Sequence, residues 1–214
     1  MISLSRAITR SRVIQAALSV CLAFALLLTG CDSEPKLPPL AQESLILAFG
    51  DSLTYGTGVE PQYAYPAILE QLTGHRVING GIPGEVSAQG LERLPALLDQ
   101  HRPGLLILCH GGNDLLRRLN LSQTDDNIRA MVTLARERNI PVILLGVPKP
   151  GIFLNSASFY TTIAKDMEAP LLDELLPGIL GDRELKSDPI HPNRQGYRLM
   201  AETIAAFMKQ HGMI

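Results

Sequence analysis

The chain carries serine, aspartate and histidine residues at positions that suit nucleophilic catalysis. Near its start, the apolar run 45–49 is closed by Gly50 and followed by Ser52, whereas Asp188 and His191 stand three residues apart near its end. A serine hydroxyl attacks a carbonyl only when an imidazole accepts its proton and a carboxylate holds that imidazole in the right tautomer. The pattern therefore predicts acyl transfer, with Ser52 as nucleophile, His191 as base and Asp188 as its orienting carboxylate.

Acyl transfer also requires hydrogen-bond donors for the oxyanion of the tetrahedral intermediate. Three groups suit this role: the N–H of Ser52, the N–H of Gly84 in a glycine-rich turn, and the side-chain amide of Asn113 after the apolar run 105–109. Gly81 in the same turn is an alternative to Gly84. Each residue also has a plainer interpretation, because serine and asparagine form turns and His191 can simply precede a helix.

Strands alternating with helices must position these groups. Apolar runs of strand length with no polar alternation indicate a sheet covered on both faces, and the absence of hairpin signals indicates parallel strands. We therefore expect a three-layer α/β/α domain with a mainly parallel sheet. Its strands are predicted at 45–49, 76–79, 105–109, 141–147 and 171–172, and its helices at 66–72, from a cap at Ser87, at 125–138, at 159–167 and after a cap at Asn193.

The motifs resemble those of the GDSL or SGNH hydrolases, and they occur in the order of that family. The resemblance implies a flavodoxin-like fold, the same roles for Ser52, His191 and Asp188, and an oxyanion hole formed by Ser52, Gly84 and Asn113. Within the family, the chain is similar to the bacterial periplasmic thioesterases, arylesterases and lysophospholipases. It departs from their pattern beside Gly84, where Pro83 and Glu85 replace the usual Ser and Asp. The matching segments are Gly-Asp-Ser-Leu at 50–53, Pro-Gly-Glu at 83–85, 90–98, Gly-Gly-Asn-Asp at 111–114 and Asp-Pro-Ile-His at 188–191.

The N-terminal residues do not have the composition of a folded domain. Three arginines precede an apolar span at 13–28, which is shorter than the ~20 residues of a membrane-crossing helix. Residues 1–30 are therefore predicted to be a signal peptide, and the sequence Leu-Thr-Gly before Cys31 resembles a lipobox, with Cys31 as the lipidated residue. An uncleaved membrane anchor is the alternative. We expect a tether at 31–43 and a hydrolase domain at 44–214.

These features predict a periplasmic lipoprotein in the bacterial cell envelope. Asp32 resembles the residue that retains enterobacterial lipoproteins at the inner membrane, which favours that membrane. Removing the three arginines of residues 1–30 from 19 basic residues leaves 16 against 21 acidic ones, a net charge of −5 that argues against nucleic acid as a partner. With Cys31 acylated, Cys109 is the remaining thiol of the body and is predicted to be buried. No zinc-ligand spacing occurs, so we expect no metal or cofactor, and we expect a monomer.

Bulky apolar residues in two loops at the predicted site indicate the substrate. Leu115, Leu116 and Leu119 follow Asn113, and Ile152, Phe153 and Leu154 lie in a loop rich in turn-forming residues. We expect these residues to bind acyl chains of carboxylic esters or thioesters, including lysophospholipids, although they would serve equally to hold the loop in place. A cell-envelope carbohydrate O-deacetylase is the main alternative, and a non-catalytic binding lipoprotein is another.

Overall fold

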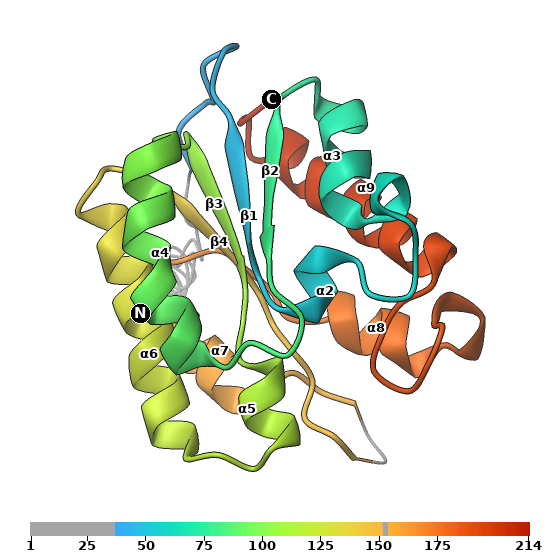
Figure 1. Ribbon diagram of the computed structural model, residues 1–214. Helices are drawn as coiled ribbons and strands as arrows, with labels where there is room; N and C mark the ends of the chain where they lie inside the picture. Colours follow the sequence, from blue (N-terminus) through green and yellow to red (C-terminus); the bar gives the residue numbers. More distant parts are fainter. Residues whose placement is uncertain (1–36, 152–153) are drawn as a thin grey trace, which may run out of the picture. The chain divides into compact units, whose positions relative to one another are not determined.

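A computed structural model describes residues 37–151 and 154–214 (Figure 1). The predictions for the signal peptide, for Cys31 and the rest of the tether up to residue 36, and for Ile152 and Phe153 lie outside these residues. Within them, five parallel strands form one sheet in the order β2-β1-β3-β4-β5, which is the flavodoxin-like order. The strands are β1 (Ile46–Gly50), β2 (Val77–Gly81), β3 (Leu105–Cys109), β4 (Val142–Leu145) and β5 (Leu171–Leu172).

Helices follow the strands and cover both faces of the sheet, as Figure 1 shows. The predicted alternation of strands and helices is therefore confirmed, with element ends displaced by a few residues. The short helices at 52–55, 112–116 and 175–181 were not predicted. The α-helices are α2 (Ser52–Tyr55), α3 (Tyr65–Thr73), α4 (Ser87–His101), α5 (Gly112–Leu116), α6 (Leu121–Arg136), α7 (Ser158–Asp166), α8 (Leu175–Gly181) and α9 (Arg194–Gln210); η1 (Pro61–Tyr63) and η2 (Arg183–Leu185) are 3₁₀ turns.

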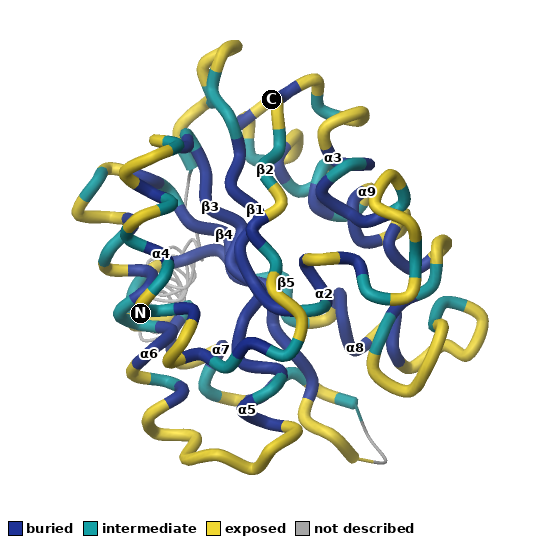
Figure 2. The backbone as a smooth tube through the Cα atoms, in the orientation of Figure 1, coloured by how far each residue is buried: buried dark blue, intermediate teal, exposed yellow. Residues whose placement is uncertain are grey.

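Strand β1 lies at the centre of both hydrophobic cores. Successive side chains of a strand point to opposite faces, so Ile46 and Ala48 pack with residues of α3, α8 and α9, whereas Leu47 and Phe49 pack with residues of α4 and α6. All four side chains are fully buried, and Figure 2 shows the central strands in the buried colour. The three-layer α/β/α prediction is confirmed. Cys109, at the end of β3, is also buried, as predicted.

The N-terminal caps of two helices were predicted from the sequence, one of them correctly. Asn193 caps α9 as predicted, because its side-chain oxygen accepts hydrogen bonds from the N–H groups of Gln195 and Gly196 at 2.9 and 3.1 Å. The prediction that Ser87 caps a helix is wrong. Ser87 is the first residue of α4, and both its N–H and its hydroxyl donate to the carboxylate of Asp114, at 2.8 and 2.6 Å. Asp114 therefore supplies the cap from a distant part of the chain.

Different segments of the chain lie at the amino edge of the sheet, where the strands begin, and at the carboxyl edge, where they end. At the amino edge, residues 37–44 lie beside the C-terminus, and the Leu40 N–H donates to the Met213 carbonyl at 2.8 Å. At the carboxyl edge lie α2, α5 and the loops around 148–156 and 186–192 (Figure 1). Nowhere in residues 37–151 and 154–214 does a helix have the length and hydropathy needed to cross a membrane.

Candidate active site

Ser52 stands at the carboxyl end of β1, as predicted. Gly50 closes the strand, and a Cβ there would collide with the Cys109 carbonyl of β3, so only glycine allows this close approach. Asp51 caps α2 by accepting a hydrogen bond from the Leu53 N–H at 3.1 Å. Ser52 is the first residue of α2, and its N–H has no acceptor in the described part of the chain.

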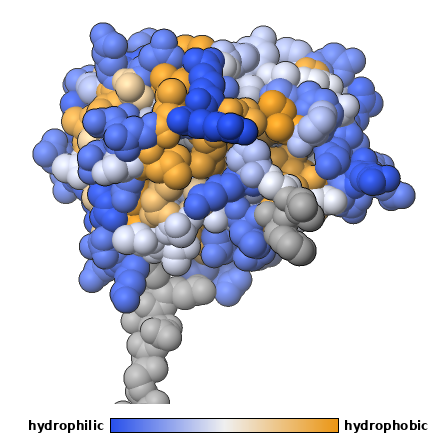
Figure 3. All heavy atoms as spheres, turned by 90° about the horizontal axis from the view of Figure 1, so that it is seen from below, coloured by the Kyte–Doolittle hydropathy of each residue, from blue (hydrophilic) through white to orange (hydrophobic). Residues whose placement is uncertain are grey.

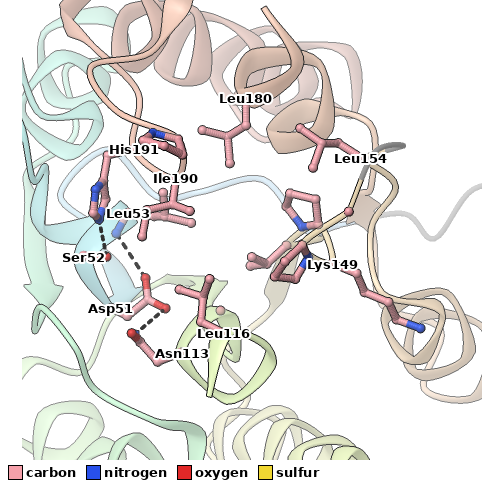
Figure 4. A pocket seen from close by; sticks show the side chains of 16 residues that line it. Asp51, Ser52, Leu53, Asn113, Leu116, Lys149, Leu154, Leu180, Ile190 and His191 are labelled. Atoms are coloured by element: carbon pink, nitrogen blue, oxygen red, sulfur yellow. Dashed lines mark hydrogen bonds between the residues drawn. The ribbon is translucent and has the colours of Figure 1, made fainter. Parts of the chain in front are cut away.

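His191 joins Ser52 to Asp188 by hydrogen bonds to its two ring nitrogens. Its Nε2 lies 3.0 Å from the Ser52 Oγ (Figure 4). Its Nδ1 lies 2.7 Å from the Asp188 Oδ2. The other oxygen, Oδ1, accepts from the N–H groups of Ile190 and His191 at 2.8 and 2.9 Å, which fixes the turn. Three residues from opposite ends of the chain thus form one continuous line of contacts.

The pKa of Asp188 determines how this line is protonated. Partial burial alone would raise that pKa, but the hydrogen bonds from His191 and from the Ile190 N–H outweigh burial and place the pKa below its ordinary value. An ionised carboxylate can only accept, so the His191 Nδ1 carries the hydrogen and Nε2 is free to accept from the Ser52 hydroxyl. This is the tautomer that a base acting on Ser52 requires.

The glycine-rich turn after β2 distinguishes the two candidate glycines. Gly84 has φ of +79°, a value that favours glycine, and its N–H has no acceptor among the residues that the structure describes. Its carbonyl accepts from the Arg117 Nη2 at 2.8 Å. By contrast, the Gly81 N–H donates to the Asn79 side chain at 3.0 Å, and α2 packs directly on Gly81. Of the two N–H groups, the one of Gly84 is therefore without an acceptor among the described residues.

Asn113 reaches the same edge from the start of α5. Its Nδ2 donates to the Glu85 carbonyl at 3.0 Å and to the Asp51 Oδ2 at 3.2 Å, and Asn113 and Ser52 line one cavity. The amide is thus oriented by the residues that flank Ser52 and Gly84. Asp51 is itself buried, and burial raises its pKa. Sequence reasoning assigned Asp51 no role, although it stands inside the Gly-Asp-Ser-Leu motif.

Comparison with known proteins identifies the family. The model of the GDSL-like lipase/acylhydrolase family matches residues 48–199. The chain belongs to this family. The thioesterase 1/protease 1/lysophospholipase L1 of Escherichia coli is 33% identical over 173 residues, 77% of this chain and 83% of that protein. Esterase TesA of Pseudomonas aeruginosa is also 33% identical, over 78% of this chain and 89% of that protein.

Solved structures agree with the family assignment. The esterase EstA of Pseudoalteromonas, in a structure inhibited by monoethylphosphonate, superimposes with a TM-score of 0.71 at 26% identity and covers 78% of this chain and 98% of its own. A crystal structure of TesA has the same TM-score at 29% identity, covering 78% of this chain and 99% of its own. This GDSL-like acylhydrolase is therefore an ester-hydrolysing enzyme.

A cavity of about 280 Å³ opens beside Ser52 in this GDSL-like hydrolase. Of the residues expected around the acyl chain, Leu116 and Leu154 line it, whereas Leu115 and Leu119 do not. Ile152 and Phe153 are not described. Figure 4 shows Leu116, Leu154, Leu180 and Ile190 around one hollow, and Figure 3 shows apolar side chains bordered by polar ones on the face of the carboxyl edge. Its other lining residues are mostly apolar as well: Leu53, Val147, Pro148, Pro150 and Pro189.

Next to the glycine-rich turn after β2 lies a cluster of charged and histidine side chains that sequence reasoning missed. Glu85 is bound by Arg93 and His110, and its side chain is 6% exposed. Burial alone would raise the pKa of Glu85, but the hydrogen bonds from His110 and Arg93 lower it to about 2. The available signals were the position of Glu85 next to Gly84 and that of His110 three residues before Asn113. Among the described residues, no group of His, Cys, Asp and Glu is arranged to hold a metal ion.

Proposed function

We propose that this enzyme is a serine esterase that hydrolyses carboxylic esters or thioesters of acyl chains through an acyl-enzyme on Ser52. The observation that carries the proposal is His191, whose two ring nitrogens lie within hydrogen-bond distance of Ser52 and Asp188. Ser52 is the nucleophile, His191 the general base and Asp188 the residue that orients and stabilises the imidazolium.

In the first half-reaction the Ser52 Oγ attacks the acyl carbon while its proton moves to the His191 Nε2. The tetrahedral intermediate collapses when His191 returns that proton to the departing alcohol or thiol, leaving the acyl group on Ser52. Water then attacks the acyl-enzyme with the same base, which releases the carboxylic acid and restores the serine hydroxyl. Both half-reactions need only the groups that already lie in contact here.

The oxyanion is held by the N–H groups of Ser52 and Gly84 and by the Asn113 amide. The first two have no acceptor among the described residues. The Asn113 amide has two, and its 3.2 Å bond to Asp51 is the longer one. We expect that bond to be exchanged for the substrate oxygen, while the bond to the Glu85 carbonyl keeps the amide in place. Loss of one such donor typically lowers kcat by about 10²- to 10³-fold.

The cavity supports acyl chains longer than acetyl as substrates. Its walls are mainly apolar and its volume exceeds what an acetyl group fills, which favours an acyl esterase over an O-deacetylase. The similar proteins named as a thioesterase and lysophospholipase support the same substrate class. Each buried CH₂ adds up to ~0.8 kcal/mol, so kcat/KM should rise over several carbons of p-nitrophenyl esters and then level off.

A matched pair of leucines tests this chain-length dependence. Leu116 lines the cavity and Leu119 does not, yet their exposed fractions are 43% and 42%. We expect Leu116→Ala to flatten the rise from butyrate to octanoate, with little change for acetate, and Leu119→Ala to behave like the wild type. A wild type that prefers acetate, or acetylated sugars, would favour the deacetylase.

Fluorophosphonate labelling tests the nucleophile. We expect the probe to modify Ser52, and Ser52→Ala to abolish both labelling and ester hydrolysis, with a loss of about 10⁴- to 10⁶-fold and an unchanged far-UV circular dichroism spectrum. Labelling of another residue, or hydrolysis by the alanine variant, would overturn the assignment.

We also propose that the enzyme is a periplasmic lipoprotein held by a lipid on Cys31. The lipobox-like sequence before Cys31 supports this, with Asp32 favouring the inner membrane. Radiolabelled palmitate should mark the wild type and miss Cys31→Ser, and equal labelling of both would exclude the lipobox. The proposed monomer is tested by light scattering of the detergent-solubilised protein.

A further inference from the structure

Glu85, Arg93 and His110 form a cluster beside the turn that carries Gly84. The Glu85 and His110 side chains are buried, and the Arg93 side chain is 24% exposed. The Arg93 Nε and Nη2 donate to the two oxygens of Glu85 at 2.9 and 2.6 Å, and Nη2 also donates to the Gly80 carbonyl at 2.9 Å. The guanidinium carbon lies 4.3 Å from the centre of the Phe49 ring. Arg93 thus clamps the turn after β2 to the buried sheet.

His110 completes this cluster from the end of β3. It is fully buried, and its Nδ1 accepts from the Gly111 N–H at 3.1 Å, so its Nε2 must carry the hydrogen that is shared with the Glu85 Oε2 at 3.1 Å. Gly90 of α4 makes room for this ring, because a Cβ there would collide with it. The Tyr160 hydroxyl holds the His110 carbonyl at 2.6 Å.

Glu85 and His110 are each connected to Asn113. The carbonyl of Glu85 accepts from the Asn113 Nδ2 at 3.0 Å, and Gly111, which His110 holds, is the N-terminal cap of the helix that carries Asn113. A displacement of Glu85 or His110 would therefore move the amide. None of the three cluster side chains lines the cavity, so none is in position to touch the substrate.

We propose that His110 and Arg93, acting through Glu85, are positioning residues that orient the Asn113 amide toward the oxyanion. This inference rests on the proposed esterase function and adds three residues to it. Since misplacing a reacting group by about 1 Å costs up to ~10² in rate, the effect falls on kcat while substrate binding stays the same. Glu85→Gln, which keeps the shape and removes the charge, should lower kcat by about 10- to 100-fold with KM unchanged.

Two substitutions of His110 separate its hydrogen bond from its bulk. Leucine fills the site without a donor, whereas glutamine restores an N–H that can reach Glu85. We expect His110→Leu to lower kcat by about tenfold and His110→Gln to recover most of that loss. Rates are expressed per fluorophosphonate-reactive site, so that a lower yield of folded enzyme does not count as a lower kcat. Equal kcat values for both variants would show that only packing matters and would overturn the proposal.

A double-variant cycle shows whether the cluster acts through Asn113. If it does, the loss in Glu85→Gln/Asn113→Ala is smaller than the product of the two single losses, because the residue being positioned is already gone. Losses that multiply would overturn the proposal. Should the buried substitutions prevent folding, Arg93→Lys, which keeps the charge but loses the paired contacts, enters the same cycle.

Asp99→Asn is the matched control. Asp99 also lies on α4 and also pairs with an arginine, Arg138 at 2.7 Å, but this pair is exposed and outside the cavity. We expect wild-type kcat from it, and a loss equal to that of Glu85→Gln would overturn the proposal. If the wild type itself neither hydrolyses esters nor reacts with the probe, the proposed function fails; if the wild type is active and the cluster variants match it, only the present inference fails.

Discussion

This enzyme contains two pairs of a carboxylate and a histidine, and they differ in where they lie. The Asp188 and His191 side chains are 44% and 13% exposed, and the second ring nitrogen of His191 faces a serine hydroxyl. The Glu85 and His110 side chains are 6% and 0% exposed, and the second ring nitrogen of His110 accepts from a backbone N–H. The same two chemical groups thus occur once near the surface beside a hydroxyl and once in the interior with both imidazole nitrogens paired within the protein.

The two pairs also differ in which ring nitrogen of the histidine carries the hydrogen. Asp188 engages Nδ1 of His191 and leaves Nε2 without a hydrogen, whereas the Gly111 N–H engages Nδ1 of His110 and so places the hydrogen on Nε2, toward Glu85. His191 is able to accept a proton from Ser52. Among the described residues, no hydroxyl is hydrogen bonded to the His110 ring, and both ring nitrogens are already paired.

The largest expected effect is that of His191→Ala. We expect kcat/KM for p-nitrophenyl butyrate to fall by about 10⁴- to 10⁶-fold, because no other group in contact with Ser52 can accept its proton. His110→Leu, measured beside it, should cost about tenfold. Comparable losses for the two variants would break the distinction between the two pairs.

Asp188→Asn should have the next largest effect, about 10³- to 10⁴-fold in kcat. Asparagine can present its own N–H to the Nδ1 of His191, which favours the wrong tautomer. Rates on p-nitrophenyl butyrate at saturating substrate measure this loss, and a wild-type kcat in the variant would show that Asp188 does not orient His191.

The smallest expected effect is on the free energy of unfolding, which should depend on how deeply each pair is buried. The pKa of Glu85 is about 2 in the folded protein against 4.5 ordinarily, so its ionised form stabilises the fold above pH 4.5 and this contribution is lost as the pH falls toward 2. Glu85→Gln should therefore lower the free energy of unfolding at pH 7 by roughly 2–3 kcal/mol, with a smaller difference from wild type below pH 4.5.

Urea unfolding of wild type, Glu85→Gln and Asp188→Asn across this pH range measures the free energy of unfolding of each protein. The pKa of Asp188 is also lowered, but its carboxylate is nearly half exposed and solvent screens its interactions. We expect Asp188→Asn to change stability less than Glu85→Gln does. The reverse order would show that the surface pair, and not the buried one, supports the fold.

The parts of the site that depend on local sequence pattern could be predicted. Ser52 follows a strand, and Asp188 and His191 lie within one turn, so their relation could be predicted from spacing together with the family motifs. The order of strands and helices followed from apolar runs in the same way. Their ends were displaced by a few residues, as with the second strand, which runs over Val77–Gly81 where 76–79 was predicted.

The contacts that sequence reasoning missed join residues far apart in the chain. Asp51 meets Asn113 across 62 positions, and Glu85 meets His110 across 25. No spacing rule connects such residues, because their approach depends on how β1, β3 and the turn after β2 are placed by the finished sheet. Ser87 failed as a predicted cap for the same reason, since the carboxylate of Asp114 reaches it from 27 positions away.

The position of residues 37–44 bears on how this domain could be joined to other proteins. Leu40 and Met213 are hydrogen bonded to each other at the amino edge of the sheet, whereas the cavity is lined by Ser52 and by loops at the carboxyl edge. Domains whose two ends lie close together tolerate insertion into a surface loop of a host protein. The two ends of the segment 40–214 therefore lie on one side of the domain, and the cavity lies on the other. A host protein or a solid support attached at these ends leaves the cavity open to substrate.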